Sequence, residues 1–105
     1  MDQFDRLAAA FADRAGVTIG ESRGFGSGTL RAGGRIFAMR NAAGVALKLP
    51  ATRVTALLAS GGGLPFDAGK GRPMKEWVVI PRQSDAEWLA LAKEALAFVA
   101  SSRKT

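Results

Sequence analysis

The stretch that decides the fold runs from Ser27 to Arg40 and reads SGTLRAGGRIFAMR. Its middle is the dipeptide Gly33-Gly34, which suits a tight hairpin because both residues tolerate positive φ. The flanking segments, Ser27 to Ala32 and Arg35 to Arg40, have the pattern of β-strands. The second segment is apolar on both alternating faces, which is typical of a central strand covered on both sides. We therefore expect an antiparallel hairpin in the middle of a sheet.

The sheet continues after this hairpin. A turn signal at residues 41–44 is followed at 45–49 by a segment with aliphatic side chains on one face. Residues 75–80 predict a further strand, which ends at Pro81. Its alternation places Glu76, Val78 and Ile80 on one face and Lys75, Trp77 and Val79 on the other. A short strand at residues 64–66 is also compatible with the pattern.

Three segments predict helices. Apolar residues recur at three- and four-residue steps from Asp2 to Ala15, and Gly16 follows where a helix ends. Pro50 opens a second helix, which the glycines after Ser60 end. Ser84 is an N-cap for a long final helix. The fold class is therefore α+β, an antiparallel sheet of four to five strands backed by helices, in the order α-β-β-β-α-(β)-β-α.

Composition bounds the function. The 105 residues are 48% hydrophobic and 23% charged, as expected for one soluble globular domain spanning residues 1–105. The chain has no cysteine and no histidine, so disulfides, thiolate nucleophiles, His-based triads and zinc sites of the usual type are excluded. The carboxylates are scattered along the chain. We expect no enzyme activity, no metal and no cofactor.

The first residues of the chain and the length of its apolar runs indicate where in the cell the protein is expected. No apolar run approaches the ~20 residues that a membrane-spanning helix needs. The first five residues, MDQFD, are acidic where a secretory signal would be basic. We therefore expect a cytoplasmic protein without membrane association.

The net charge of +6 is concentrated in the middle of the chain. Ten basic and three acidic side chains lie between residues 20 and 83, so this part carries a net charge of +7. Such a bias attracts polyanions, but it also serves solubility alone. The candidate binding residues come from this part and are Arg31, Arg35, Arg40, Lys70, Arg72, Lys75 and Trp77.

Each group of candidates has a functional and a structural interpretation. The three arginines flank the hairpin and either form one patch for phosphates or face solvent separately. The loop from Gly61 to Lys75, which begins GGGLPFDAGKGR, either presents Lys70, Arg72 and Lys75 to an anion or is a solvated loop that Pro65 and Phe66 anchor to the core. Trp77 is either a stacking platform beside Lys75 or a core residue under a helix, and the pattern favours the core.

The glycine cluster Gly24-Phe25-Gly26-Ser27-Gly28 resembles a phosphate-binding loop only superficially. A P-loop needs Lys-Ser/Thr and a helix directly after its last glycine, whereas Thr29-Leu30 enters a predicted strand. The cluster therefore favours a structural role, in which glycines let a strand bend or approach a neighbour.

Several separated motifs resemble the TfoX N-terminal domain family, which is related to YjbR-like proteins. They are the run from Arg23 to Arg40, the segment ALKLP at 46–50, GxPF at 63–66 and GRPMKEW at 71–77. The resemblance covers roughly residues 4–98. It implies a small antiparallel sheet backed by helices and a regulatory or adaptor role, and it transfers no catalytic residues.

Two functional hypotheses follow. The first is a non-catalytic regulatory domain that binds a protein partner or a second copy of itself. The second is weak, nonspecific nucleic-acid binding through the basic sheet and loop region. The helices have balanced charge, so major-groove reading by one of them is not expected.

Overall fold

The computed structural model describes residues 3–12, 14, 16–20, 28–66 and 74–102. The chain forms three helices and six strands in these ranges. They are α1 (Gln3–Ala10), β1 (Val17–Gly20), β2 (Thr29–Ala32), β3 (Arg35–Asn41), β4 (Gly44–Lys48), α2 (Ala51–Ser60), β5 (Leu64–Pro65), β6 (Trp77–Pro81) and α3 (Asp85–Ser102).

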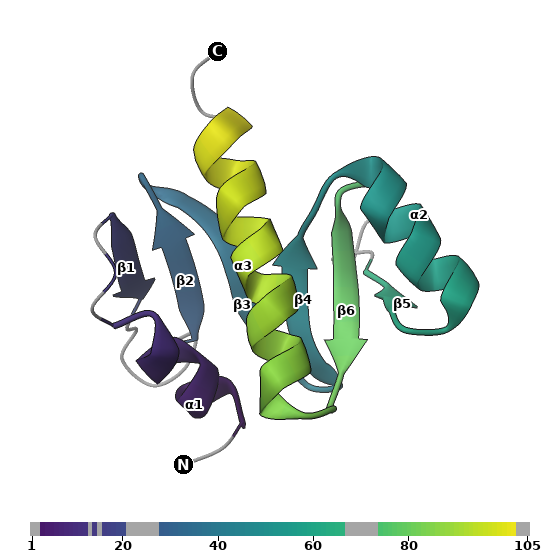
Figure 1. Cartoon of the computed structure of the whole chain (residues 1–105), viewed down its shortest axis with the longest axis horizontal. Helices are drawn as coiled ribbons and strands as arrows, with labels where there is room; N and C mark the ends of the chain where they lie inside the picture. The colour runs from purple at the N-terminus through teal and green to yellow at the C-terminus, as the bar shows by residue number, and fades with distance from the viewer. Residues whose placement is uncertain (1–2, 13, 15, 21–27, 67–73, 103–105) are drawn as a thin grey trace.

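The strands form one sheet in the order β1-β2-β3-β4-β6-β5, and all neighbours are antiparallel (Figure 1). The α+β class and the order of the predicted elements are confirmed. The sheet also contains β1, an edge strand beyond the four to five expected. Four residues are too few for a clear alternation, so the sequence did not separate β1 from the glycine-rich segment around it.

The central hairpin forms as predicted. Gly33 and Gly34 both have positive φ, of 59° and 85°, which a two-residue turn of this kind requires. The β2–β3 pairing contains a bulge, because Leu30 pairs with Ala38 whereas Arg31 pairs with Ile36. Phe37 is the extra residue, and both Phe37 and Ala38 are fully buried. The bulge lets β3 direct two consecutive side chains into the interior.

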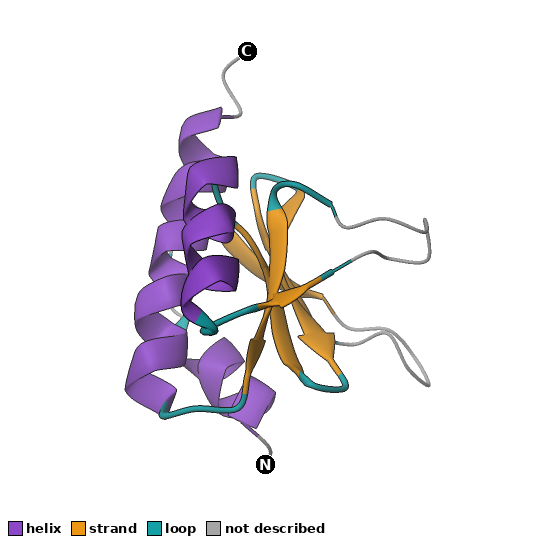
Figure 2. Ribbon diagram, turned by 90° about the vertical axis from the view of Figure 1, so that its right-hand side faces the viewer, coloured by secondary structure: helices purple, strands orange, loops and turns teal. Residues whose placement is uncertain are grey.

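All three helices lie on one face of the sheet (Figure 2). The main hydrophobic core fills the space between the helices and this face. Its largest fully buried side chains include Phe11, which meets Phe37 edge to face at 5.6 Å between ring centroids, and Trp88 from α3. The indole Nε1 of Trp88 donates a hydrogen bond to the carbonyl of Pro81 at 3.0 Å, so this buried polar atom is satisfied.

The observed helix boundaries confirm two of the start and end signals in the sequence and correct a third. α2 begins after Pro50 and ends at Gly61, whose φ of 82° and backbone N–H complete the C-cap. The Ser84 hydroxyl accepts a hydrogen bond from the N–H of Glu87 at 3.1 Å, which confirms the predicted cap of α3. α1 ends at Ala10, earlier than the predicted Ala15, because the following hydrogen bonds from Phe11 and Ala12 close tighter three-residue turns.

Salt bridges join the helices to each other and to the sheet. Arg6 pairs with Asp85 at 2.7 Å and so links α1 to the start of α3. Arg53 pairs with Glu94 at 2.9 Å and links α2 to the middle of α3. No helix within the described ranges is long and apolar enough to span a membrane.

Candidate functional site

The face of the sheet opposite the helices, here called the outer face, carries a second row of apolar side chains. Met39, Ala46, Val79 and Leu64 form one cross-strand row over β3, β4, β6 and β5. Ala46 is fully buried and Val79 is 4% exposed, yet neither belongs to the core under the helices. Leu64 is 43% exposed and is the one large hydrophobic residue in the described ranges that is classed as exposed. The outer face is therefore largely apolar at its centre.

Trp77 lies on this outer face. It pairs with Lys48 across β4 and β6, and its half-buried ring contacts the Phe66 ring at 5.8 Å between centroids. The ammonium of Lys48 lies 5.7 Å from the indole centroid and 3.5 Å from the Glu76 carboxylate. Glu76 thus helps to hold a cation against the aromatic ring. The expectation that Trp77 packs under a helix is wrong, because the alternation of β6 directs Val78 and Ile80 to the helices instead.

The base of this aromatic cluster is held by backbone hydrogen bonds. The N–H of Met74 donates to the carbonyl of Phe66 at 2.8 Å, and the N–H of Trp77 donates to Met74 at 3.4 Å. Strand β6 begins at Trp77 rather than at Lys75, so Lys75 lies in the preceding turn and is exposed. Lys48, and not Lys75, is therefore the cation that the sheet pairs with Trp77.

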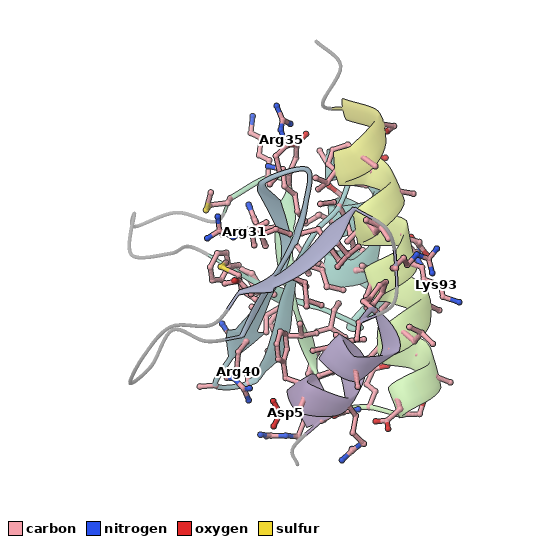
Figure 3. All side chains as sticks on the ribbon, turned by 90° about the vertical axis from the view of Figure 1, so that its left-hand side faces the viewer. Asp5, Arg31, Arg35, Arg40 and Lys93 are labelled. Carbon is pink, nitrogen blue, oxygen red and sulfur yellow. The ribbon has the colours of Figure 1, made fainter. Side chains whose placement is uncertain are left out.

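The three hairpin arginines lie in three different places (Figure 3). Arg35 is at the β2–β3 turn, Arg31 points away from the helices, and Arg40 lies at the opposite end of β3, beside Asp5 of α1. The hairpin therefore does not gather them into a single basic patch. Lys70 and Arg72 lie outside the described residues, as does most of the glycine cluster at 24–28.

Arg40 is fixed by two contacts with α1. Its guanidinium lies 4.9 Å from the centroid of the Phe4 ring, and its Nη2 donates to Asp5 Oδ1 at 2.9 Å. A cation–π contact and a charge-assisted hydrogen bond together orient this side chain. Gly28 also packs against Arg40, and its carbonyl accepts a hydrogen bond from the Arg40 N–H at 2.7 Å.

Sequence reasoning did not single out Met39, Lys48 or Leu64 as functional residues. The alternation of residues 45–49 already placed Lys48 opposite the aliphatic face. Its proximity to Trp77, however, depends on β4 lying beside β6, and 29 positions separate the two residues. No sequence signal indicated which strands are neighbours in this part of the sheet.

The titratable groups show no catalytic arrangement in the part of the chain that is described. The hydrogen bond from the Arg6 side chain holds the pKa of the Asp85 carboxyl below its ordinary value. This group supports the α1–α3 junction and lies away from the outer face. No cluster of three acidic side chains suitable for a metal occurs among the described residues.

In comparisons with known proteins, no family model, no curated protein and no solved structure matches this chain. The geometry of the candidate site consists of an apolar row, a half-buried tryptophan with a neighbouring phenylalanine, and a lysine, Lys48, that is paired with Glu76 beside the tryptophan.

Proposed function

We propose that this chain is a non-catalytic regulatory or adaptor domain that binds a protein partner through the outer face of its sheet. The observation that carries the proposal is a set of hydrophobic side chains that keep exposed area on this face and lie outside the main core: the exposed Leu64 and the half-buried Met39, Phe66 and Trp77. Contiguous apolar surface rimmed by polar groups is a mark of protein–protein contact sites.

The charges on this face support a protein partner over a polyanion. Arg31 is exposed on the outer face, but Lys48 is already paired with Glu76. The central row contains no charged side chain. A partner that fits would present apolar side chains to Leu64, Phe66 and Trp77 and an acidic group to Arg31. The resemblance to the TfoX N-terminal domain family supports a regulatory role for such binding.

The aromatic cluster supplies the side chains expected to contribute most to affinity. Trp and Tyr dominate binding energy at interfaces because a rigid ring buries a large area at low entropy cost. Trp77 is half-buried and held by Phe66 and Lys48, so it is ordered before a partner arrives. Preorganisation of this kind reduces the entropy that binding must overcome.

A matched pair of substitutions tests the proposal. Leu64→Glu places a negative charge on the outer face, whereas Ala97→Glu places the same charge on the exposed side of α3. We expect immobilised wild-type protein and Ala97→Glu to retain the same proteins from a lysate of the source cells, and Leu64→Glu to lose them. Light scattering of the free protein identifies the case in which the partner is a second copy. Equal retention by all three proteins, or none above the bead background, contradicts the proposal.

Weak nonspecific nucleic-acid binding is the second candidate, and Trp77 with its neighbouring Lys48 favours it. Half-buried rings beside a cation on a sheet face are the means by which sheet-based domains stack single-stranded bases. Fluorescence anisotropy with a labelled oligonucleotide over a salt series tests it, because binding driven by phosphates weakens steeply as salt rises. Absence of binding at low salt eliminates this candidate.

A further inference from the structure

A pocket of about 280 Å³ lies at the end of the sheet away from Arg35. It is formed by the start of α1, the turn between β3 and β4, and the residue that follows β6. The lining side chains and backbone belong to Phe4, Arg40, Asn41, Ala42, Gly44 and Arg82. The lining thus contains two guanidinium groups and one carboxamide, and none of the lining residues is acidic.

Arg40 is the ordered cation of this pocket. The Phe4 ring lies under its guanidinium at 4.9 Å, and Asp5 accepts from Nη2 at 2.9 Å. A guanidinium carries five N–H donors in a planar fork, and the hydrogen bond from Nη2 to Asp5 uses one of them. The contact with Asp5 therefore orients Arg40 and reduces its positive charge in part.

Asn41 and Arg82 add further donors. The Asn41 Oδ1 accepts a hydrogen bond from the N–H of Ala43 at 2.9 Å, so its amide NH₂ is the end that can donate to a ligand. Arg82 is exposed and has no ion pair within the part of the chain that is described. Pro81 precedes it and ends β6, and Arg82 lines the pocket directly after the strand.

We propose that this pocket binds a phosphate group. Arginine forks recognise phosphate oxygens through paired hydrogen bonds, and two guanidinium groups match a dianion better than a single carboxylate. The volume falls just below the roughly 300–1,000 Å³ of pockets for drug-sized ligands, so the pocket suits a phosphate with a small attached group. The site is separate from the outer face and does not depend on the proposed protein-binding function.

Inorganic phosphate is the probe for the first experiment, titrated into ¹⁵N-labelled protein at constant ionic strength. We expect saturable chemical-shift changes at the backbone amides of Asn41, Ala42, Gly44 and Arg82, and much smaller changes with acetate. If acetate saturates the same amides with equal affinity, the assignment to phosphate is wrong. If no saturable change occurs up to about 100 mM phosphate, which exceeds even a ~10 mM Kd, the pocket is not a phosphate site.

Two variants that each remove one positive charge distinguish binding in this pocket from general electrostatic attraction of phosphate. Arg82→Gln is expected to weaken phosphate binding about three- to fivefold, in keeping with the modest strength of exposed charge pairs. Arg35→Gln removes the same charge at the far end of the sheet and should leave the affinity unchanged. Equal weakening by both variants indicates nonspecific attraction and overturns the proposal.

For Asp5→Asn we expect phosphate binding to become stronger, in contrast to Arg82→Gln. This variant removes the carboxylate that competes for Arg40, so phosphate should bind about two- to fivefold more tightly. A simple loss of local structure would weaken binding instead, and the dispersion of the amide spectrum shows directly whether the variant is folded. If the folded variant binds no more tightly than wild type, Arg40 is not a ligand of the anion and the proposed site is wrong.

Discussion

At the residue scale, Gly44 shows how closely two strands approach each other. It opens β4 and pairs with Pro81 of β6, and a Cβ built on it would overlap the carbonyl oxygen of Ile80. This close neighbour is backbone, so it cannot rotate away as a flexible side chain would. Gly44 is therefore required for the β4–β6 contact, which also forms one wall of the phosphate pocket.

We expect Gly44→Ala to lower the free energy of unfolding by about 1–3 kcal/mol, the usual cost of overpacking. Urea unfolding followed by circular dichroism measures the loss. Gly62→Ala is the matched control, because its Cβ would meet the Ser60 hydroxyl at an ordinary 3.4 Å. The control should stay within about 0.5 kcal/mol of wild type. Similar losses in the two variants would show that the contact with Ile80 is not the cause.

Asp85 provides a second prediction at this scale, in the pH dependence of stability. Hydrogen bonds from Arg6 at 2.7 Å and Gln3 at 2.9 Å lower the pKa of its carboxyl in the folded state. A depressed pKa means that the carboxylate stabilises the fold above the unfolded-state value. This contribution is lost as pH falls through the lower, folded-state pKa.

Asp85→Asn should therefore have a lower melting temperature than wild type at about pH 7, and the difference should shrink towards about pH 2. Thermal unfolding at several pH values measures it. Glu87→Gln is the control, since Glu87 also lies in the first turn of α3 but has no ion pair within the described residues. If the difference in melting temperature between Asp85→Asn and wild type is constant over this pH range, the stabilisation does not come from the ionised Asp85 carboxylate.

At the element scale, α3 depends on a cap that the sequence already indicated. The Ser84 hydroxyl accepts from the N–H of Glu87 at 3.1 Å, and the Ser84 carbonyl accepts from the N–H of Trp88 at 3.2 Å. The cap fixes where the helix begins and thereby the position of Trp88, which is 2% exposed. An N-cap hydroxyl satisfies a backbone donor that has no partner inside the helix.

We expect Ser84→Ala to cost about 1 kcal/mol of stability, with a range of roughly 0.5–2 kcal/mol for lost caps. Ser101→Ala makes the same chemical change at the other end of α3, where the hydroxyl donates a hydrogen bond to the Phe98 carbonyl at 3.1 Å. This control should change stability by less than about 0.5 kcal/mol. Chemical unfolding of the two variants measures both losses of stability. Equal losses would show that the Ser84 cap has no special role in stabilising α3.

At the scale of the whole molecule, the two faces of the sheet differ in what they contact. The helices and one face enclose the main core, whereas the outer face has a smaller apolar surface around Leu64 and Trp77. This division separates the residues that stabilise the fold from those proposed to bind a partner.

A pair of phenylalanine substitutions tests the division. Phe11 is fully buried against Phe37, so Phe11→Ala should cost about 3–5 kcal/mol, which is a large part of the stability of a small domain. Phe66 is half-buried on the outer face, and Phe66→Ala should cost clearly less while reducing partner retention. Equal destabilisation measured by urea unfolding would show that the outer face is part of the stabilising core.

The sequence by itself determined the elements. The Gly33-Gly34 turn, the end of α2 at Gly61 and the cap at Ser84 all depend on residues a few positions apart, and local backbone preferences decide them. The apolar residues Trp88, Leu91 and Ala95 recur at helical spacing in the sequence, and this pattern by itself predicts the burial of Trp88. In α1 the spacing indicated the buried Phe11 but not the end of the helix, because tighter turns present apolar residues at a similar interval.

The tertiary structure alone decided which side chains meet. Trp77 lies beside Lys48 because β6 inserts next to β4, and Arg40 lies with Asp5 and near Arg82 because α1 and the end of β6 converge on the β3–β4 turn. These contacts join segments far apart in the chain, and their formation depends on strand order and on which face the helices cover. Local propensity carries no information on either, so both candidate sites emerged only from the folded chain.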